Sequence, residues 1–255
     1  MTTAHSGSGD LNRSLQLLWQ GRETATRGPK PGLTLEAIVT AAVGVADREG
    51  LAALSMRRVA AELGVGTMSL YRYVPGKGEL LDLMLDHVNA PGKEEQEEYR
   101  GKHWRPLLEL VGVSMFELYR SHPWLLQVNQ TRPLLGPNSL LGFDIALSCL
   151  EGLGLTGQEK VTIIVTLDSY ITGIARTYVL HQQAAEESGI TDEEFWAAQA
   201  PIIETALQSG CYPHVFQLDE DSFSLPYEDS MRFGLARLLD GLESFIETRR
   251  GRQRT

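Results

Sequence analysis

The residues with the clearest chemistry for contacting another macromolecule lie between positions 66 and 72. The apolar spacing predicts a short helix that begins at Thr67 and buries Leu70, so that its other side chains face outward. These side chains supply hydroxyls, a thioether, a phenol and a guanidinium, and such groups fit the base edges of a DNA major groove. We expect the following residues to read bases: Gly66, Thr67, Met68, Ser69 and Arg72.

The surrounding residues would hold this helix as the second helix of a helix-turn-helix. Ser55 can cap a preceding helix, because its hydroxyl accepts a hydrogen bond from an unpaired backbone N–H group. Gly64 suits the left-handed conformation that ends a helix, and Pro75 prevents the second helix from continuing. Groups that favour phosphate oxygens are supplied by Ser55, Arg57, Tyr71, Tyr73 and Lys77.

Arg58 has two interpretations. It could contact a phosphate, or it could form a surface ion pair with Glu62, four residues later on the same helix. We favour the ion pair.

A third helix should precede this pair and another should follow it. Apolar residues at helical spacing predict a helix over residues 34–49, ended by Gly50. Apolar residues at the same spacing after Lys77 predict a further helix that ends at Val88. This helix would contact both the three-helix unit and the rest of the chain, so it could transmit movement between them.

Residues 1–33 are interpreted as a flexible basic arm. The proline and glycine content of residues 27–32 excludes a helix there. Arg22, Arg27 and Lys30 give the arm positive charge, which suits contact with the DNA backbone or minor groove. The alternative is a disordered tail whose charge is incidental.

The most distinctive motif occupies residues 70–77 and reads Leu-Tyr-Arg-Tyr-Val-Pro-Gly-Lys. With it, residues 34–88 resemble the DNA-binding domain of the TetR family of bacterial transcriptional regulators. The resemblance implies an all-α fold, with an N-terminal helix-turn-helix three-helix domain and a larger, tetracycline-repressor-like C-terminal domain over residues 89–255 for ligand binding and dimerisation. It further implies a repressor that binds a palindromic operator in double-stranded DNA as a homodimer and is released by a small-molecule effector.

The remainder of the chain shows only helical periodicity. The longest predicted helix, near residues 156–188, is apolar nearly all round and must therefore be covered on several sides. By resemblance, this helix and the final helix, near residues 227–248, form the homodimer interface. Residues 249–254 are expected to be a basic tail in solvent.

Residues of types that line ligand pockets occur along this domain, although such residues are more often ordinary core. They are Trp104, Met115, Phe116, Trp124, Phe143, Asp168, Tyr170, Arg176, Tyr178, His181 and Trp196. Asp168 falls on an apolar face, where an unpaired carboxylate is costly. We expect an ion pair with Arg176, and the alternative partner is a polar group of a bound ligand.

Charge is divided unevenly along the chain. The net charge is −10 overall, but residues 1–77 hold nine basic and six acidic residues, or +3, which leaves −13 for the rest. Attraction to nucleic acid depends on local patches, so a cationic reading unit on an acidic body is consistent with DNA binding.

Other classes of protein find little support. Enzyme motifs such as Gly-x-Ser-x-Gly, His-Glu-x-x-His and a phosphate-binding glycine loop are absent from the sequence, so an enzyme is not expected, nor is a cofactor or a metal. The two cysteines are far apart, and no secretion signal or run of eighteen apolar residues is present, which favours a cytoplasmic protein without a membrane span. The remaining alternative is a DNA-binding regulator or activator with no small-molecule effector.

Overall fold

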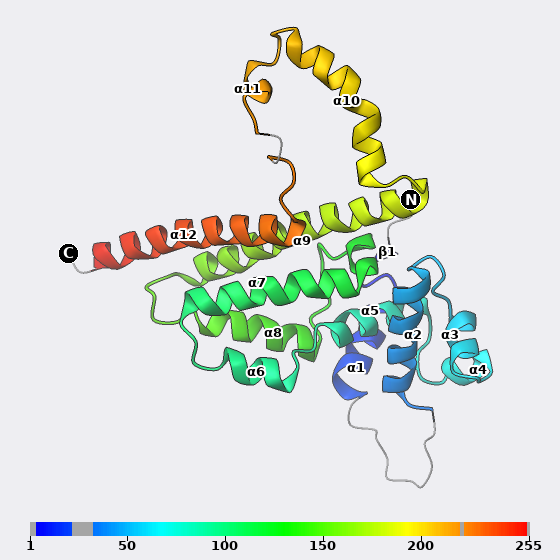
Figure 1. Cartoon of the computed structure of the whole chain (residues 1–255). Helices are drawn as coiled ribbons and strands as arrows, with labels where there is room; N and C mark the ends of the chain where they lie inside the picture. Colours follow the sequence, from blue (N-terminus) through cyan, green and yellow to red (C-terminus); the bar gives the residue numbers. More distant parts are fainter. Residues whose placement is uncertain (1–3, 22–32, 220–221, 254–255) are drawn as a thin grey trace.

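The computed structural model describes residues 4–21, 33–219 and 222–253, and nearly all regular structure in these ranges is α-helical (Figure 1). The all-α fold predicted from the sequence is confirmed. The N-terminal part contains β1 Ala4–His5, α1 Leu11–Gln20, α2 Leu35–Glu49, α3 Met56–Glu62, α4 Thr67–Leu70 and α5 Lys77–Val88. The C-terminal part contains α6 Lys93–Tyr99, α7 Trp104–Ser121, the 3-10 helix η1 Pro123–Gln127, β2 Val128–Asn129, α8 Pro137–Ser148, α9 Gly157–Ser188, α10 Asp192–Gln208, α11 Pro213–Phe216 and α12 Tyr227–Gln253.

Helices α2 to α5 form one packed unit, the reading head. Thr34 begins α2, because its hydroxyl accepts a hydrogen bond from Ala37 N at 3.0 Å, and Ser55 begins α3 by accepting one from Arg58 N at 3.2 Å. Gly64, between α3 and α4, has a φ of +65°, which glycine adopts at little cost. The buried core includes Ile38, Ala42, Val59, Leu70, Leu80 and Met84. The predicted helix-turn-helix is therefore confirmed.

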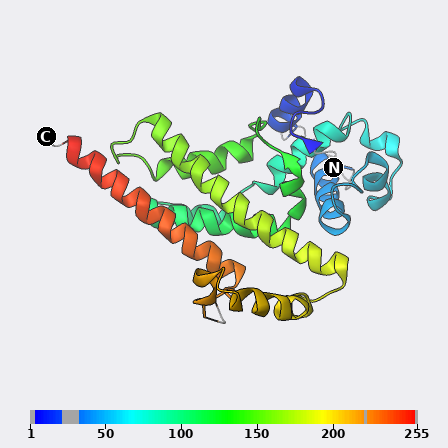
Figure 2. The same ribbon diagram turned by 90° about the horizontal axis from the view of Figure 1, so that it is seen from above.

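The C-terminal domain is built around α7, α9 and α12, which pack against one another (Figure 2). A Cβ atom at Gly112 of α7 would lie 3.0 Å from Leu235 Cδ2 of α12, so glycine permits the close approach of these two helices. The buried side chains of this core include Leu108, Phe116, Ile163, Leu167, Ile171, Met231, Leu235 and Leu239. This second core is separate from the core of the reading head.

The N-terminal segment departs from the expected flexible arm. β1 pairs in parallel with β2 of the C-terminal domain, and α1 packs on α5 of the reading head. Leu18 of α1 is buried in the core of the reading head. The prediction of a flexible arm is therefore wrong for residues 4–21, while Arg22, Arg27 and Lys30 lie outside the described residues.

The end of the chain also differs from the expectation. The final helix continues to Gln253 instead of stopping near residue 248. Arg249 forms an ion pair with Glu159 at the start of α9, and its guanidinium lies 5.7 Å from the centre of the Phe245 ring. The expectation of a solvated tail is thus wrong at Arg249, because a cation on this helix reaches the carboxylate on α9.

Helices α10 and α11 project away from the bundle (Figure 1). No residue of either helix is buried. Large apolar side chains are exposed along the segment, namely Phe195, Trp196, Ile202, Ile203, Tyr212, Val215, Phe216, Phe223 and Leu225. Within one chain this surface remains uncovered.

The two cysteines are expected to react at very different rates. Cys211 is exposed, whereas Cys149 is half-buried and burial raises the pKa of its thiol from 9.0 to about 11. Two pKa units reduce the thiolate fraction about 100-fold near neutral pH, and the thiolate is the reactive form. Iodoacetamide at pH 7.5, followed by peptide mass spectrometry, should label Cys211 first, and equal labelling rates would contradict the burial of Cys149.

Candidate nucleic-acid interface and effector domain

Helix α4 presents its side chains outward from a single anchor. Leu70 is fully buried, while Met68 is 76% exposed and Tyr71 and Arg72 are exposed. Gly66 is the N-cap, and a Cβ atom there would meet nothing within 4 Å. Among the predicted base readers, Gly66, Met68 and Arg72 are thus exposed, whereas Thr67 and Ser69 are half-buried.

The residues predicted to bind phosphates differ in how far their side chains are already engaged within the protein. Arg57 is exposed, and neither it nor Arg72 forms an ion pair within the described part of the chain. Lys77 Nζ lies 3.5 Å from Leu51 O, and Tyr73 is half-buried against the core. Ser55 has its hydroxyl engaged as the cap of α3. Arg57 and Arg72 are consequently the cations most available to an anionic partner.

Arg58, the next residue of α3, has a structural role. Its guanidinium lies 2.6 Å from Glu49 Oε1 and 2.8 Å from Glu62 Oε2, while Arg48 lies 2.7 Å from Glu62 Oε1. Hydrogen bonding to Arg58 lowers the pKa of both glutamates, Glu49 and Glu62. The predicted ion pair between Arg58 and Glu62 is therefore present within α3. The pairs Arg58–Glu49 and Arg48–Glu62 in addition join α2 to α3.

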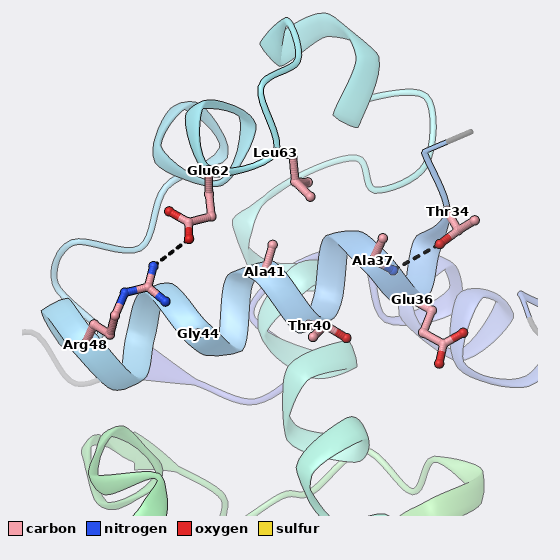
Figure 3. Close-up of a pocket in the computed structure, with 9 residues that line it drawn as sticks. All are labelled: Thr34, Glu36, Ala37, Thr40, Ala41, Gly44, Arg48, Glu62 and Leu63. Carbon is pink, nitrogen blue, oxygen red and sulfur yellow. Dashed lines mark hydrogen bonds and ion pairs between the residues drawn. The ribbon is translucent and has the colours of Figure 1, made fainter. Parts of the chain in front are cut away.

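An open groove runs between α2 and α3 beside this ion pair (Figure 3). Its apolar floor includes Ala37, Ala41 and Leu63, and the bond between Arg48 and Glu62 closes one end. A second hollow lies between α10 and α11. Neither contains any residue that the sequence analysis proposed for a ligand pocket.

The reading head and the C-terminal domain meet at α5. Asp86 is buried, and its carboxylate accepts hydrogen bonds from Asn138 N at 3.1 Å and Ser139 N at 2.9 Å, at the start of α8. A Cβ atom at Gly136 would lie 2.3 Å from Asp86 Oδ1, so only glycine leaves room for this contact. The backbone N–H groups at the start of α8, which have no acceptor within the helix, thus find one in this carboxylate. The residues that make this joint were missed by sequence reasoning, although a carboxylate on the apolar helix α5 was a signal.

A second joint links α2 to η1. Asp47 Oδ1 accepts a hydrogen bond from Trp124 Nε1 at 2.8 Å and lies 2.8 Å from His122 Nδ1. Trp124 is buried in the core of the reading head. Trp124, which was predicted to line a ligand pocket, therefore packs at the domain junction and not in the core of the C-terminal domain.

Asp168 and Arg176 do not form the expected ion pair. Arg176 Nη2 instead donates to Leu126 O in η1 at 2.9 Å. Asp168 is exposed rather than enclosed in an apolar face, although neighbouring protein raises the pKa of its carboxyl by displacing water that would solvate the charge. Its charge also raises the pKa of Tyr119, after the larger effect of burial. The predicted ion pair was wrong because the backbone carbonyl of η1 offers Arg176 a closer acceptor.

Three predicted pocket residues meet in one aromatic cluster. The Phe116 and Tyr178 rings lie 5.9 Å apart, centre to centre, and Tyr178 contacts Tyr227 at 5.8 Å. His181 lies 5.2 Å from Tyr227 on its other side, and the Arg120 guanidinium lies 5.3 Å from the Tyr178 ring centre. Tyr227 was missed because it joins the cluster from α12, far away in sequence.

The other predicted pocket residues are scattered. Trp104 is buried at the start of α7, Tyr170 donates to a backbone carbonyl of α12 at 2.9 Å, and Trp196 is exposed on α10. Met115 and Phe143 are half-buried on α7 and α8. The structure does not gather all eleven predicted residues into one site.

Helix α9 has two opposite faces with different surroundings. Buried apolar residues recur every fourth position from Ile163 to Val179, and the opposite row is exposed. This exposed row consists of Val161, Val165, Ser169, Gly173 and Thr177. By length and composition α9 could cross a membrane, because its most apolar 18-residue stretch has a mean hydropathy of 1.2, and 28% of that stretch is buried within the chain. Core helices of soluble proteins share this composition, and a face of small residues suits contact with another helix.

Helix α12 has a matching exposed row. It consists of Phe233, Arg237, Gly241 and Phe245. A Cβ atom at Gly173 of α9 or at Gly241 of α12 would meet nothing within 4 Å, so both helices have room for close approach by another chain.

Comparison with known proteins agrees with this arrangement of two domains. The family described as bacterial regulatory proteins, tetR family, matches residues 38–84, and the tetracyclin repressor-like C-terminal domain matches residues 99–246. A helix-turn-helix head joined to such a domain defines a DNA-binding transcriptional regulator. The chain belongs to the TetR family.

Individual relatives support the assignment over most of the chain. The chain is 53% identical over 250 residues to the HTH-type transcriptional repressor DrrR1 of Streptomyces coeruleorubidus, covering 98% of this chain and 92% of the relative. It is 30% identical over 200 residues to an HTH-type transcriptional regulator of Saccharopolyspora erythraea, covering 78% and 84%.

Solved structures share the fold over a similar length. Apo ActR from Streptomyces coelicolor has a TM-score of 0.65 at 28% identity, covering 88% of this chain and 99% of that chain. ActR in complex with actinorhodin has a TM-score of 0.64 at 26% identity, covering 84% and 97%.

Proposed function

We propose that this protein is a repressor that binds a palindromic operator as a homodimer and is released from it by a small molecule. The observation that carries the DNA-binding part is α4, where a buried Leu70 anchors a helix whose Met68 remains exposed, with the exposed Arg72 just after its end. Similarity to the repressor DrrR1 supports repression as the outcome of DNA binding. The ligand-bound state of ActR supports a small-molecule effector.

In this proposal the residues of α4 and its neighbours divide their roles. Bases are read by Gly66, Thr67, Met68, Ser69 and Arg72, since the first turns of a recognition helix approach base edges most closely. Phosphates are bound by Ser55, Arg57, Tyr71, Tyr73 and Lys77. Arg22, Arg27 and Lys30 would add positively charged contacts to the DNA backbone or minor groove.

Two substitutions should separate these roles. Arg57→Ala is expected to weaken binding to all duplexes and to reduce the salt slope of log K by about 1, because it removes one phosphate contact. Ser69→Ala is expected to alter base preference at one position and to leave the salt slope unchanged. Fluorescence anisotropy on selected and random duplexes over a salt series measures both. Equal losses on both duplexes for both variants would contradict the division.

The homodimer would use the exposed rows of α9 and α12. Two copies related by a twofold axis bring four helices together, which would cover Val161, Val165 and Phe233. The axis also places two reading heads on one palindrome, so that weak contacts to each half-site combine. The exposed apolar segment of α10 and α11 offers further surface to the second copy.

An effector would bind beside α8. Although this helix is rich in apolar residues, only Asn138 and Ala146 are buried, and Leu140, Phe143 and Leu147 remain half-buried on a helix that packs near α7 and α9. The side of α9 that carries Ile164, Asp168, Thr172 and Arg176 supplies polar groups, including the Thr172 hydroxyl 3.0 Å from Tyr119 Oη. Such a mixture of apolar walls and a few polar groups is typical of small-molecule sites.

Release of DNA by a chosen compound tests the effector part. Actinorhodin is the first probe, because ActR binds it, and a panel of polycyclic aromatic compounds follows. We expect at least one compound to bind the protein and to dissociate the protein from a selected duplex. Compounds that bind without changing DNA affinity, or a panel in which none binds, would favour the alternative of a regulator without a small-molecule effector.

A further inference from the structure

Helix α5 carries a row of three buried carboxylates. Glu79, Asp82 and Asp86 follow one another at spacings of three and four residues, and each is no more than 6% exposed. Within the described residues none of them forms an ion pair. A buried carboxylate without a cation is costly unless hydrogen-bond donors surround it. Each of the three carboxylates therefore needs hydrogen-bond donors from another part of the chain.

Two of these carboxylates bind the N-terminal segment. Asp82 accepts hydrogen bonds from Gly7 N at 2.8 Å and from the Ser14 hydroxyl at 2.7 Å. Glu79 Oε1 accepts one from Asp10 N at 2.7 Å. Since these donors come from residues 4–21, the segment is seated on the reading head by charge-assisted hydrogen bonds, which are stronger than neutral ones.

The same segment is bound to the C-terminal domain along its other edge. Ser6 N donates to Asn129 O at 3.1 Å next to the paired strands β1 and β2, and Leu134 N donates to the Ser6 hydroxyl at 3.3 Å. Trp19 Nε1 donates to Leu135 O at 3.2 Å. Residues 4–21 therefore form a strap that holds both domains, and Figure 1 shows it at their junction.

The part of the C-terminal domain that holds the strap is connected to the dimerisation helix. β2 directly follows η1, and η1 is bound to α9 through the hydrogen bond from Arg176 to Leu126 O. A movement of η1 against α9 would thus pull on β2, the strap and Asp82 in turn.

We propose that the strap positions the reading head and transmits DNA binding to the C-terminal domain, in parallel with the direct joint between Asp86 and α8. Glu79 and Asp82 act as positioning residues in this arrangement. The inference rests on the proposed function, because it takes DNA binding at α4 as the event transmitted. Coupling requires that both ends of the strap remain bound while the two domains shift.

The strap can be displaced by one methyl group. A Cβ atom at Gly78 would lie 2.6 Å from Gly9 N and 2.8 Å from Gly9 Cα, which are backbone atoms of the strap. Gly78→Ala should therefore push the strap away, whereas alanine at this position of α5 favours the helix itself. Gly44→Ala is the matched control in the same head, because its Cβ would meet only the end of the Arg48 side chain, at 3.2 Å.

Hydrogen–deuterium exchange of the full-length protein, alone and saturated with a duplex that the wild-type protein selects from a random library, tests the proposal. In the free protein, Gly78→Ala should speed exchange of the Gly7 and Asp10 amides by roughly tenfold or more. In the wild type and in Gly44→Ala, the duplex should change exchange in η1, β2 and the start of α8. In Gly78→Ala this distant response should fall by at least about half.

Each alternative result has a distinct meaning. An undiminished response in Gly78→Ala with the strap exposed would overturn transmission by the strap. Unchanged exchange of the Gly7 and Asp10 amides in that variant would overturn the seating itself. A wild-type protein that binds the duplex without any response in η1, β2 or α8 would overturn coupling, whereas failure of the wild type to select any duplex would instead refute the proposed function.

Discussion

Replacing Val165 with glutamate is expected to convert the protein to a monomer and to reduce its affinity for a selected palindrome by about 100-fold or more. Val165 is 53% exposed on α9, opposite the buried row, so glutamate there leaves the core of each chain intact. In a dimer built on α9 and α12 the carboxylate would be buried without a partner, which costs several kcal/mol. Sedimentation velocity and a DNA titration measure both effects.

Leu141→Glu is the matched control for this experiment. Leu141 is also exposed, at 38%, but it lies on α8, outside the exposed rows of α9 and α12. This variant should remain dimeric and bind DNA as the wild type does. A dimeric Val165→Glu protein with unchanged affinity would refute the proposed interface, and a folded monomer with full affinity would refute the need for two heads.

Asp86→Ala is expected to lower the free energy of unfolding by about 3 kcal/mol. The substitution leaves the amide groups of Asn138 and Ser139 without their acceptor and opens a small cavity at the domain joint. Urea unfolding at fixed protein concentration measures the loss, since dimerisation makes apparent stability depend on concentration. The same variant should also weaken the response of the C-terminal domain to DNA.

The control is Asp144→Ala on α8. Asp144 is exposed, and its removal should change the free energy of unfolding by no more than about 0.5 kcal/mol. A similar small effect for Asp86→Ala would show that the joint contributes little to stability and that its hydrogen bonds are replaced by water at no cost.

Sequence reasoning succeeded where the structure is decided locally. The cap Ser55 and the left-handed Gly64 act within a few residues, so spacing alone predicts the two helices and the turn between them. The second helix, however, ends at Leu70, before the stop predicted at Pro75. The long helix α9 was also predicted nearly to the residue, because its capping residue Thr156 and its apolar period are local signals.

Long-range pairing explains what the sequence did not predict. The segment that binds Asp82 lies about seventy positions earlier in the chain, and its serines and glycines look the same in a free tail as in a seated strap. Arg176 lies eight positions from Asp168, but it is bound to a backbone carbonyl of η1, and backbone acceptors carry no sequence signature.

The predicted ligand pocket also depended on long-range packing that the sequence does not reveal. Phe116, Tyr178 and His181 do come together, but Tyr227 completes the cluster from a separate helix. Trp124 is of a residue type common in ligand pockets, but here it packs at the domain junction and donates a hydrogen bond to Asp47. Residue type predicts burial well, but only the fold decides which core or surface a side chain joins.

Selection of bound sequences from a random duplex library by the purified full-length protein, at moderate salt, tests the central claim most directly. The account predicts a palindromic consensus whose half-sites are separated by about one helical turn, because two reading heads related by a twofold axis would bind together. Recovery of sequences without any consensus would contradict a sequence-specific dimeric repressor and would leave nonspecific binding as the function of the reading head.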